Sequence, residues 1–299
     1  MPRPETGIVR RGLRPYDKHM ACIPVMFFSG SGSTALIAEL IAGRLAARGH
    51  DAPLLSVEQN SDPGLLGACD LAVIGTPTYH NCPAGTLLDW IARWPPGAGP
   101  ARAFLFATFG LYTGNAPHLL GQALAARGVR TVGHTGFRGP ASDSVMMLPA
   151  WIGFMFRYER RIARRIDTAA GQIAALAEQP DAPGRLPPRR WYAPLDHVPN
   201  RVIARNRFRR RLAPGLRVLP GRWQGEAVDC PRGCWQAGPG GVPVCDPADC
   251  DFCLRCVHRS PRRAVIWDAA MQDRPRLDPA FYAARRAEIA AQFPPVDAG

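Results

Sequence analysis

The sequence predicts an α/β fold in which a doubly wound, five-stranded parallel sheet precedes a small cysteine-containing module. Short apolar runs alternate with amphipathic segments of helical periodicity between residues 23 and 137. Polar loops follow three of those runs. Six of the nine cysteines then crowd between Cys230 and Cys256, with the spacing of metal ligands. These observations predict a ligand-binding sheet edge and a separate metal module.

The predicted elements alternate along the first half of the chain. Strands are expected over residues 23–28, 51–57, 70–75, 102–108 and 129–135, and helices over 34–48, 86–93 and 116–127. The first helix ends at Gly49, a residue that often terminates helices. The third strand is almost wholly apolar, as a strand buried on both faces should be. Because strands alternate with helices, the strands are expected to be parallel.

The second half is expected to be less regular. A long amphipathic helix over residues 154–178 should cover the sheet, and a terminal helix over 278–293 should begin at an Asp278 cap followed by Pro279. The Pro- and Arg-rich stretch between them is typical of a linker. The expected parts are an N-terminal arm (1–21), the α/β domain (22–178), the linker (179–222), the cysteine module (223–270), and a C-terminal helix and tail (271–299).

Composition limits the protein class. The chain has 299 residues, of which 46% are hydrophobic and 20% charged, enough for one large and one small domain. No apolar run reaches the roughly 18 residues of a membrane span. The best candidate, residues 145–156, is too short and should be buried or docked at a surface. Residues 1–19 lack the apolar core of a secretory signal, so a reducing cytoplasm is the expected compartment.

The loop after the first predicted strand has the features of a phosphate site. It stands immediately before a helix, whose first N–H groups attract anions, and its glycines allow close approach of the backbone. Neither a P-loop lysine nor a G-x-G-x-x-G pattern is present. A plain strand-to-helix turn would look similar. The candidate phosphate-binding residues are Ser29, Gly30, Ser31, Gly32, Ser33 and Thr34.

Two further loops follow the third and fourth predicted strands. The carboxyl ends of strands are where open α/β sheets bind ligands. Aromatic, polar and glycine residues in these loops suit a flat ring with polar edges. Tyr79 is expected to stack on the ring, whereas a lone histidine such as His80 is more often structural. The candidate residues are Pro77, Thr78, Tyr79, His80, Asn81, Thr108, Phe109, Gly110, Gly114 and Asn115.

The cysteine run Cys250, Cys253, Cys256 has the C-x2-C-x2-C spacing of a bacterial ferredoxin. In two-cluster ferredoxins the fourth cysteine, placed before a proline, ligates the other cluster. Ser260 takes that position here, and Cys230-Pro231 keeps a Cys-Pro pair without three preceding cysteines. One cluster has therefore lost its ligands. The other keeps Cys230, Cys250, Cys253 and Cys256, which predicts a single [4Fe–4S] centre.

Alternatives to this ligand set exist. Cys245 competes with Cys230 for the fourth position, because Cys245-x4-Cys250-x2-Cys253 copies the opening of plant-type [2Fe–2S] sites, and Cys234 is a third candidate. A zinc site is also possible on composition, although zinc modules usually bring paired C-x2-C motifs or histidines. Cys22, Cys69 and Cys82 stand singly and are expected to pack in the core or loops.

These segments resemble a known arrangement. The loops at 28–34, 77–79 and 109–114 resemble those of flavodoxin, and residues 250–261 resemble the second half of a bacterial ferredoxin. Together they resemble the bacterial and archaeal flavodoxin–ferredoxin fusion family over most of residues 23–267. The resemblance implies strand order 2-1-3-4-5, bound FMN and a two-cluster module. Ser260 and the three missing cysteines depart from that pattern and put one cluster in doubt.

The resulting hypothesis is an electron-transfer protein that passes electrons between FMN, one [4Fe–4S] cluster and a protein partner. The formal net charge is +13, with arginines concentrated at residues 157–165 and 201–211. Such patches attract acidic proteins, anionic lipid or nucleic acid, or are simply solvated. Without a nucleic-acid module, an acidic redox partner is preferred. The alternatives are an FMN-dependent small-molecule reductase with a structural zinc module, and a non-catalytic binding module.

Overall fold

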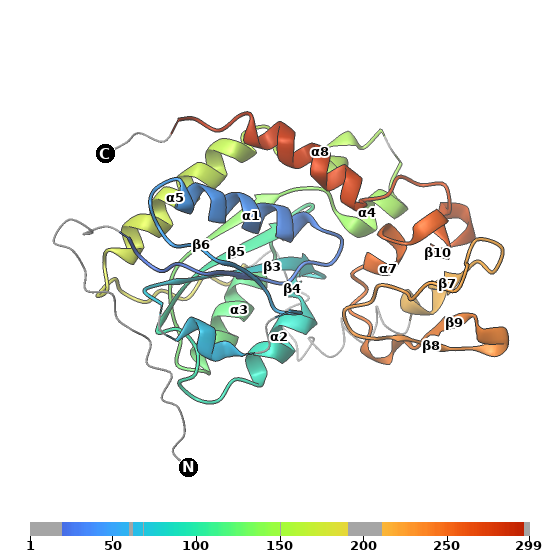
Figure 1. The fold of residues 1–299 in the computed structure, drawn as a ribbon, viewed down its shortest axis with the longest axis horizontal. Coiled ribbons are helices and arrows are strands. Elements are labelled where there is room, and N and C mark those ends of the chain that lie inside the picture. The colour runs from blue at the N-terminus through green and yellow to red at the C-terminus, as the bar shows by residue number, and fades with distance from the viewer. Residues whose placement is uncertain (1–19, 60–61, 68, 150, 191–210, 296–299) are drawn as a thin grey trace, which may run out of the picture.

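A computed structural model describes residues 20–59, 62–67, 69–149, 151–190 and 211–295 (Figure 1). Its main sheet has five parallel strands in the order β2-β1-β3-β5-β6, which is the predicted order 2-1-3-4-5. The strands are β1 (Val25–Phe27), β2 (Leu54–Ser56), β3 (Ala72–Tyr79), β5 (Arg102–Phe109) and β6 (Arg130–Arg138). A sixth, two-residue strand, β4 (Cys82–Pro83), pairs antiparallel with β3 and was not predicted.

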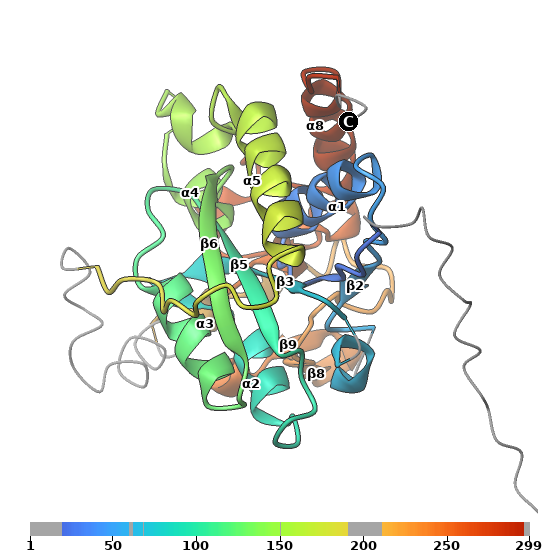
Figure 2. The ribbon, with the colours of Figure 1, turned by 90° about the vertical axis from the view of Figure 1, so that its left-hand side faces the viewer.

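Helices cover both faces of this sheet (Figures 1 and 2). The helices α1 (Ser33–Ala46) and α5 (Ile162–Ala177) lie on one face, and α2 (Gly85–Ala92) and α3 (Ala116–Ala125) on the other. Each face buries its own apolar core, because the strand residues alternate between the two sides. A short 3-10 helix, η1 (Pro63–Leu66), follows β2. The doubly wound α/β architecture is confirmed.

The third strand is longer than predicted because it continues into a hairpin. It extends to Tyr79, and His80 and Asn81 both have positive φ angles of 52° and 68° before β4 begins. Two successive left-handed residues are the signature of a type I′ hairpin turn. The stretch expected to be a loop is therefore a rigid β-hairpin at the sheet edge.

The predicted single helix over residues 154–178 is wrong. The segment is instead divided between a 3-10 helix, η2 (Gly153–Phe156), and α5, with Arg157 extended between them. A further short helix, α4 (Ser142–Met147), precedes the segment. Local polar bonds explain the break. The Tyr158 hydroxyl lies 3.1 Å from Ser33 Oγ, and the Glu159 carboxylate accepts a hydrogen bond from the Arg138 backbone N–H. These bonds hold the chain against the sheet rather than in a helix.

The C-terminal part forms a second, four-stranded antiparallel sheet in the order β10-β7-β9-β8. Its regular elements are short: η4 (Ala213–Gly215), β7 (Arg217–Val218), β8 (Trp235–Ala237), η5 (Pro239–Gly241), β9 (Pro243–Cys245), η6 (Pro247–Asp249), α7 (Arg255–His258), η7 (Pro261–Arg263), β10 (Val265–Ile266) and η8 (Ala269–Met271). Strand β7 falls in the range expected to be a linker. Much of that range, residues 191–210, lies outside the described residues, as do the N-terminal arm's residues 1–19.

This small module lies beside the end of the main sheet where β3 and β4 meet (Figure 1). The last helix, α8 (Pro279–Ala290), then returns to pack on α1 and α5. As predicted, Asp278 caps it, accepting a hydrogen bond of 2.8 Å from the Phe281 N–H. No helix in the described ranges is long and apolar enough to cross a membrane.

The three single cysteines lie outside the C-terminal module. Cys22 and Cys69 immediately precede β1 and β3 respectively, approximately at the amino ends of these strands, and their sulfur atoms are 3.1 Å apart. Cys82 belongs to the hairpin strand β4. All three side chains are half-buried, as packing residues in loops or at strand ends would be.

Candidate functional site

A cavity of about 410 Å3 opens at the carboxyl ends of the strands β1, β3 and β5. The three loops that the sequence analysis singled out meet there, because parallel strands deliver their following loops to one edge. Of the candidate residues, those lining the cavity are Ser29, Gly30, Ser31, Ser33, Thr34, Pro77, Thr78, Tyr79, His80, Asn81, Thr108, Phe109 and Gly110. The remaining wall was not predicted: Leu111, Tyr112, Pro140, Ala141, Ser142, Asp143, Ser144, Leu148, Met155 and Phe252.

The remaining three candidates support the cavity from behind. Gly32 has a φ of 145°, and a Cβ there would meet the Tyr282 ring at 2.5 Å. A Cβ on Gly114 would likewise lie 2.7 Å from Asn81, so these two residues are in close contact. Asn115 donates its backbone N–H to the Asn81 carbonyl at 3.1 Å. These residues hold the first loop and the hairpin in place.

The first loop presents hydroxyls at the start of α1. Ser31 Oγ lies 3.0 Å from the Tyr282 hydroxyl, and Thr34 Oγ1 lies 2.7 Å from Thr108 Oγ1. Ser29 Oγ and Thr78 Oγ1 are buried and have no hydrogen-bond partner among the described residues. Burying a hydroxyl without a partner is costly, so both groups are suited to bonding a ligand in the cavity. Together with the helix N-terminus, this is a donor set for a phosphate.

The Tyr79 hydroxyl contacts the first loop at Gly30. A Cβ on Gly30 would come within 2.0 Å of the Tyr79 hydroxyl, so only glycine fits at that position of the loop. Burial raises the pKa of the Tyr79 phenol well above its ordinary value, which keeps it protonated. Next to it, burial lowers the pKa of His80 to about 4 despite the carboxylates of Asp143 and Asp251. The hairpin therefore offers a neutral imidazole to the cavity.

A second, smaller pocket is lined by cysteines of the C-terminal module. Cys230, Cys234, Cys250, Cys253 and Cys256 all line it, although 26 residues of chain separate the first from the last. The Cys245 thiol does not line the pocket but contacts that of Cys250. Among the residues that the structure describes, no three Cys, His, Asp or Glu side chains converge closely enough to hold one metal ion.

The cysteine loop has an unusual backbone. Phe252 and Leu254, the residues on either side of Cys253, have φ angles of 52° and 58°. Left-handed non-glycine residues cost free energy and concentrate where a site needs them. The Phe252 N–H points at the Cys250 sulfur, 3.3 Å away. Burial raises the pKa of Cys253 to about 12 and that of Cys256 well above its ordinary value, so both are thiols in the absence of a cation.

His258 and Ser260 have structural roles. His258 is buried, with Nε2 3.0 Å from the Ser142 carbonyl and Nδ1 accepting the Leu277 N–H at 3.1 Å. Both ring nitrogens are thereby engaged. Ser260, which stands where the ferredoxin-like pattern would have a cysteine, accepts the Val265 N–H at 2.8 Å and starts the turn at Pro261.

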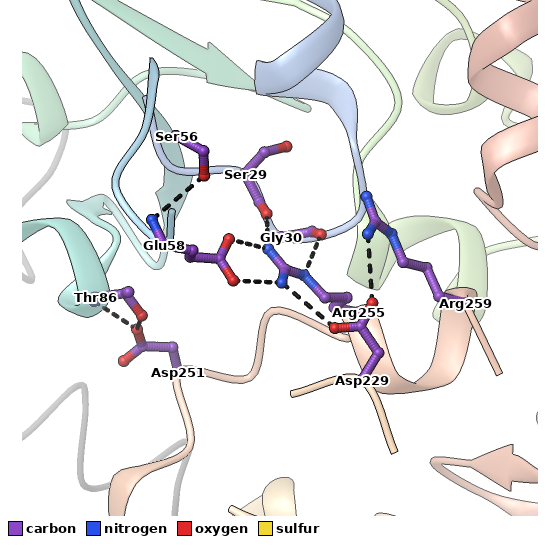
Figure 3. A network of polar contacts seen from close by, with 9 residues as sticks. All are labelled: Ser29, Gly30, Ser56, Glu58, Thr86, Asp229, Asp251, Arg255 and Arg259. Atoms are coloured by element: carbon purple, nitrogen blue, oxygen red, sulfur yellow. Dashed lines mark hydrogen bonds and ion pairs between the residues drawn. The ribbon is translucent and has the colours of Figure 1, made fainter. Parts of the chain in front are cut away.

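Arg255 joins the cysteine loop to the first loop (Figure 3). Its guanidinium forms a two-pronged ion pair with Glu58, at 2.6 and 2.5 Å, and donates to the backbone carbonyls of Ser29 and Gly30. Although burial acts to lower it, the pKa of Arg255 is raised by this pairing. Asp229 completes the set at 3.5 Å. Two carboxylates therefore balance the guanidinium charge, and Arg255 fixes the backbone of the candidate phosphate loop.

Two more contacts fix the cysteine loop on the α/β domain. The buried Asp251 carboxylate accepts hydrogen bonds from the Thr86 N–H at 2.9 Å and its hydroxyl at 3.1 Å, and so caps α2 (Figure 3). Cys253 itself touches the first loop, since a Cβ on Gly30 would lie 3.0 Å from Cys253 Cβ. Phe252 is the one residue of the cysteine module in the cavity wall given above.

Sequence reasoning missed the residues that join distant segments. Phe252, Arg255 and Tyr282 lie far along the chain from the loops they touch, and no spacing pattern connects them. Two of them carried a weak signal: an aromatic and an arginine occupy the variable positions of the C-x2-C-x2-C run. The residues 140–144 gave no signal, because the break before α5 was not predicted.

Comparison with known proteins gives distant likenesses only. No family model matches the chain, and no curated protein matches it. Among solved structures, a flavodoxin from the domain Archaea has 14% identity and a TM-score of 0.40, covering 52% of this chain and 99% of that one. Flavodoxin 2 from Bacillus cereus has 20% identity and a TM-score of 0.39 over 52% and 99%. TM-scores this low do not establish a shared fold. The fold assignment of this chain rests on its own strand order.

Proposed function

We propose that the protein is an electron carrier that holds FMN in the sheet-edge cavity and one [4Fe–4S] cluster in the cysteine pocket. Electrons pass between the two cofactors and on to a protein redox partner. Bound FMN can exchange two electrons together or singly, and the cluster exchanges one at a time. The observation that carries the proposal is the direct contact between the two sites at Phe252 and at the Gly30–Cys253 junction.

The cavity fits FMN in size and chemistry. Its volume of about 410 Å3 falls in the usual range for small-ligand sites, about 300–1,000 Å3. The 14-residue helix α1 begins at the first loop, and the buried hydroxyls of Ser29 and Thr78 have no hydrogen-bond partner among the described residues. The first loop and the N-terminus of α1 would hold the phosphate, and Arg255 would fix the backbone of that loop. The hairpin 77–81 and the loop 108–110 would hold the flavin ring between them.

Support for a cluster comes from the ligand set rather than from the size of the pocket. Five cysteines line the pocket, but its volume is only about 10 Å3, so binding a cube would require the cysteine-bearing segments to move apart. A cube takes one thiolate at each of its irons. The proposed ligands are Cys230, Cys250, Cys253 and Cys256. Their raised pKa values mean that each of these thiols releases a proton when it binds iron.

Cofactor analysis of anaerobically purified protein tests this function. We expect one equivalent of FMN and about four each of iron and acid-labile sulfide per chain. Zinc without sulfide would contradict the cluster, and absence of FMN at any added concentration would contradict the carrier as a whole. The visible spectrum should show a broad iron–sulfur band near ~400 nm beneath the flavin bands.

Three matched variants identify the fourth ligand. Cys230→Ala should lose iron and sulfide while still binding FMN, whereas Cys234→Ala and Cys245→Ala should keep both. Cys230 is expected to matter because it lines the pocket and interacts electrostatically with both Cys253 and Cys256. A cluster that survives Cys230→Ala but not one of the other two changes would reassign the ligand and leave the carrier function intact.

A further inference from the structure

An exposed apolar surface surrounds the mouth of the cavity. Nine large hydrophobic side chains are exposed in the described residues, and five of them are Leu111, Tyr112, Met147, Trp151 and Phe154. Leu111 and Tyr112 lie on the loop after β5, and the other three on the α4–η2 segment. Leu111, Tyr112, Leu148 and Met155 line the cavity, so the five exposed side chains belong to the two segments that form this part of its wall. We call them the mouth patch.

The mouth patch is more apolar than an ordinary protein surface. Trp151 is 82% exposed and Leu111 60%. From Met147 to Phe156 the sequence has no charged side chain, and its only side-chain hydrogen-bond donor is the Trp151 indole. Apolar patches of this kind mark interaction sites, whereas single exposed hydrophobic residues need no explanation.

A cluster of arginines borders the patch at the start of α5. Arg160, Arg161, Arg164 and Arg165 line a groove there, beginning six residues after Phe154 in the chain. Arg165 pairs with Glu159, whereas Arg160, Arg161 and Arg164 form no ion pair with described residues. Cations at a helix N-terminus are unfavourable because of the helix dipole, and the first turn contains no acidic residue. An anionic partner would offset this cost.

We propose that the mouth patch and these arginines bind the protein peripherally to an anionic lipid bilayer. Aromatic and aliphatic side chains on a protruding segment, followed by a cationic one, are the features of interfacial membrane anchors. Trp151 suits the interfacial region, where tryptophan is enriched. An acidic protein is the less favoured occupant, because an uncharged ten-residue stretch is more apolar than ordinary protein interfaces, which are only about 56–58% apolar.

The consequence concerns access to the cavity. Docking on the mouth patch would turn the opening toward the membrane, so the partner that exchanges electrons would be one held in the membrane. This consequence rests on the proposed function, but membrane binding itself does not.

Vesicle co-sedimentation of the full chain tests the proposal. Phosphatidylcholine vesicles containing phosphatidylglycerol should bind the protein, pure phosphatidylcholine should bind it weakly, and added salt should weaken binding. Trp151→Ser and the triple change Arg160→Gln, Arg161→Gln, Arg164→Gln should each lower the partition coefficient about tenfold or more. Val244→Ser and Arg217→Gln are the controls, since both residues are exposed but lie on the C-terminal sheet.

The outcomes separate the hypotheses. The proposal would be overturned if the wild-type protein did not co-sediment with anionic vesicles. It would also be overturned if the Trp151 and arginine variants bound these vesicles as well as the controls do. Binding to an immobilised acidic polypeptide but not to vesicles would assign the surface to an acidic protein instead, and so also overturn it. Circular dichroism verifies that each variant is folded. Cofactor content is measured separately, so failure here leaves the proposed function standing.

Discussion

Phe252 is the residue on which communication between the two proposed sites depends. Its ring lines the cavity and packs edge-on against Trp267 at 5.1 Å between centroids, while its N–H contacts the Cys250 sulfur. The left-handed backbone places it there, at a cost of about 1–3 kcal/mol. A residue kept in such a conformation, with a bulky side chain where glycine would be easier, is expected to have a function in the cavity.

Phe252→Leu should therefore weaken FMN binding while preserving the fold. Leucine keeps the apolar contact but removes the ring, so we expect the Kd for FMN to rise about 2- to 10-fold and flavin fluorescence to increase as aromatic quenching is lost. Fluorescence titration measures both quantities. Phe293→Leu is the control, because Phe293 packs against Arg44, outside the cavity. Equal effects of the two changes would refute the role of Phe252.

At the residue scale, the sequence predicted those site residues that belong to a recognisable spacing pattern. The C-x2-C-x2-C run, Cys230-Pro231 and the serine-rich first loop were predicted as site residues from short sequence patterns, and they line the two pockets. Arg255 and Tyr282 could not be found in this way. Their partners are backbone carbonyls and a hydroxyl of the first loop, more than 220 residues away, and such contacts depend on how the two parts pack.

At the scale of elements, alternation of strands and helices predicted the sheet and its cover correctly. The two misses have different causes. Backbone conformation sets the end of β3, whereas hydrogen bonds to α1 and β6 set the start of α5. The positive φ angles of His80 and Asn81 end the strand, and the bonds of Tyr158 and Glu159 prevent the helix from continuing.

Helix α2 provides an element-scale test of how the cysteine loop is attached. Asp251 caps this helix from another part of the chain and lies 3.7 Å from Arg232. Asp251→Ala should lower the free energy of unfolding by about 1–2 kcal/mol, the range for a lost helix cap. Denaturant titration measures it. The control, Asp62→Ala, removes the exposed cap of the short helix η1 and should cost less. Equal losses would mean that the interdomain cap adds nothing.

At the scale of the whole molecule, the first loop is enclosed by segments from both ends of the chain. The cysteine module contacts it through Arg255 and Cys253, and α8 through Tyr282. The C-terminal segments therefore complete a site that the α/β domain begins. This arrangement predicts that the two proposed cofactor sites form and unfold together.

Arg255 is the residue whose loss should separate them. Arg255→Ala leaves Glu58 and two loop carbonyls without their partner. Because Arg255 is buried but Glu58 is partly exposed, the cost should exceed the roughly 1 kcal/mol of a surface pair and stay below the about 3–5 kcal/mol of a fully buried one. Arg259→Ala is the matched control: Arg259 also pairs with Asp229 but is more exposed, so its loss should cost about 1 kcal/mol or less (Figure 3).

Thermal unfolding followed by two probes distinguishes the outcomes. Flavin fluorescence reports release from the cavity, and iron–sulfur absorbance reports loss of the cluster. In wild-type protein and in Arg259→Ala the two transitions should coincide, because one cooperative unit holds both sites. In Arg255→Ala they should separate, with flavin released at the lower temperature since the first loop loses its support. Coincident transitions in Arg255→Ala would mean that the Asp251 cap and the Tyr282 contact hold the two parts together without the arginine.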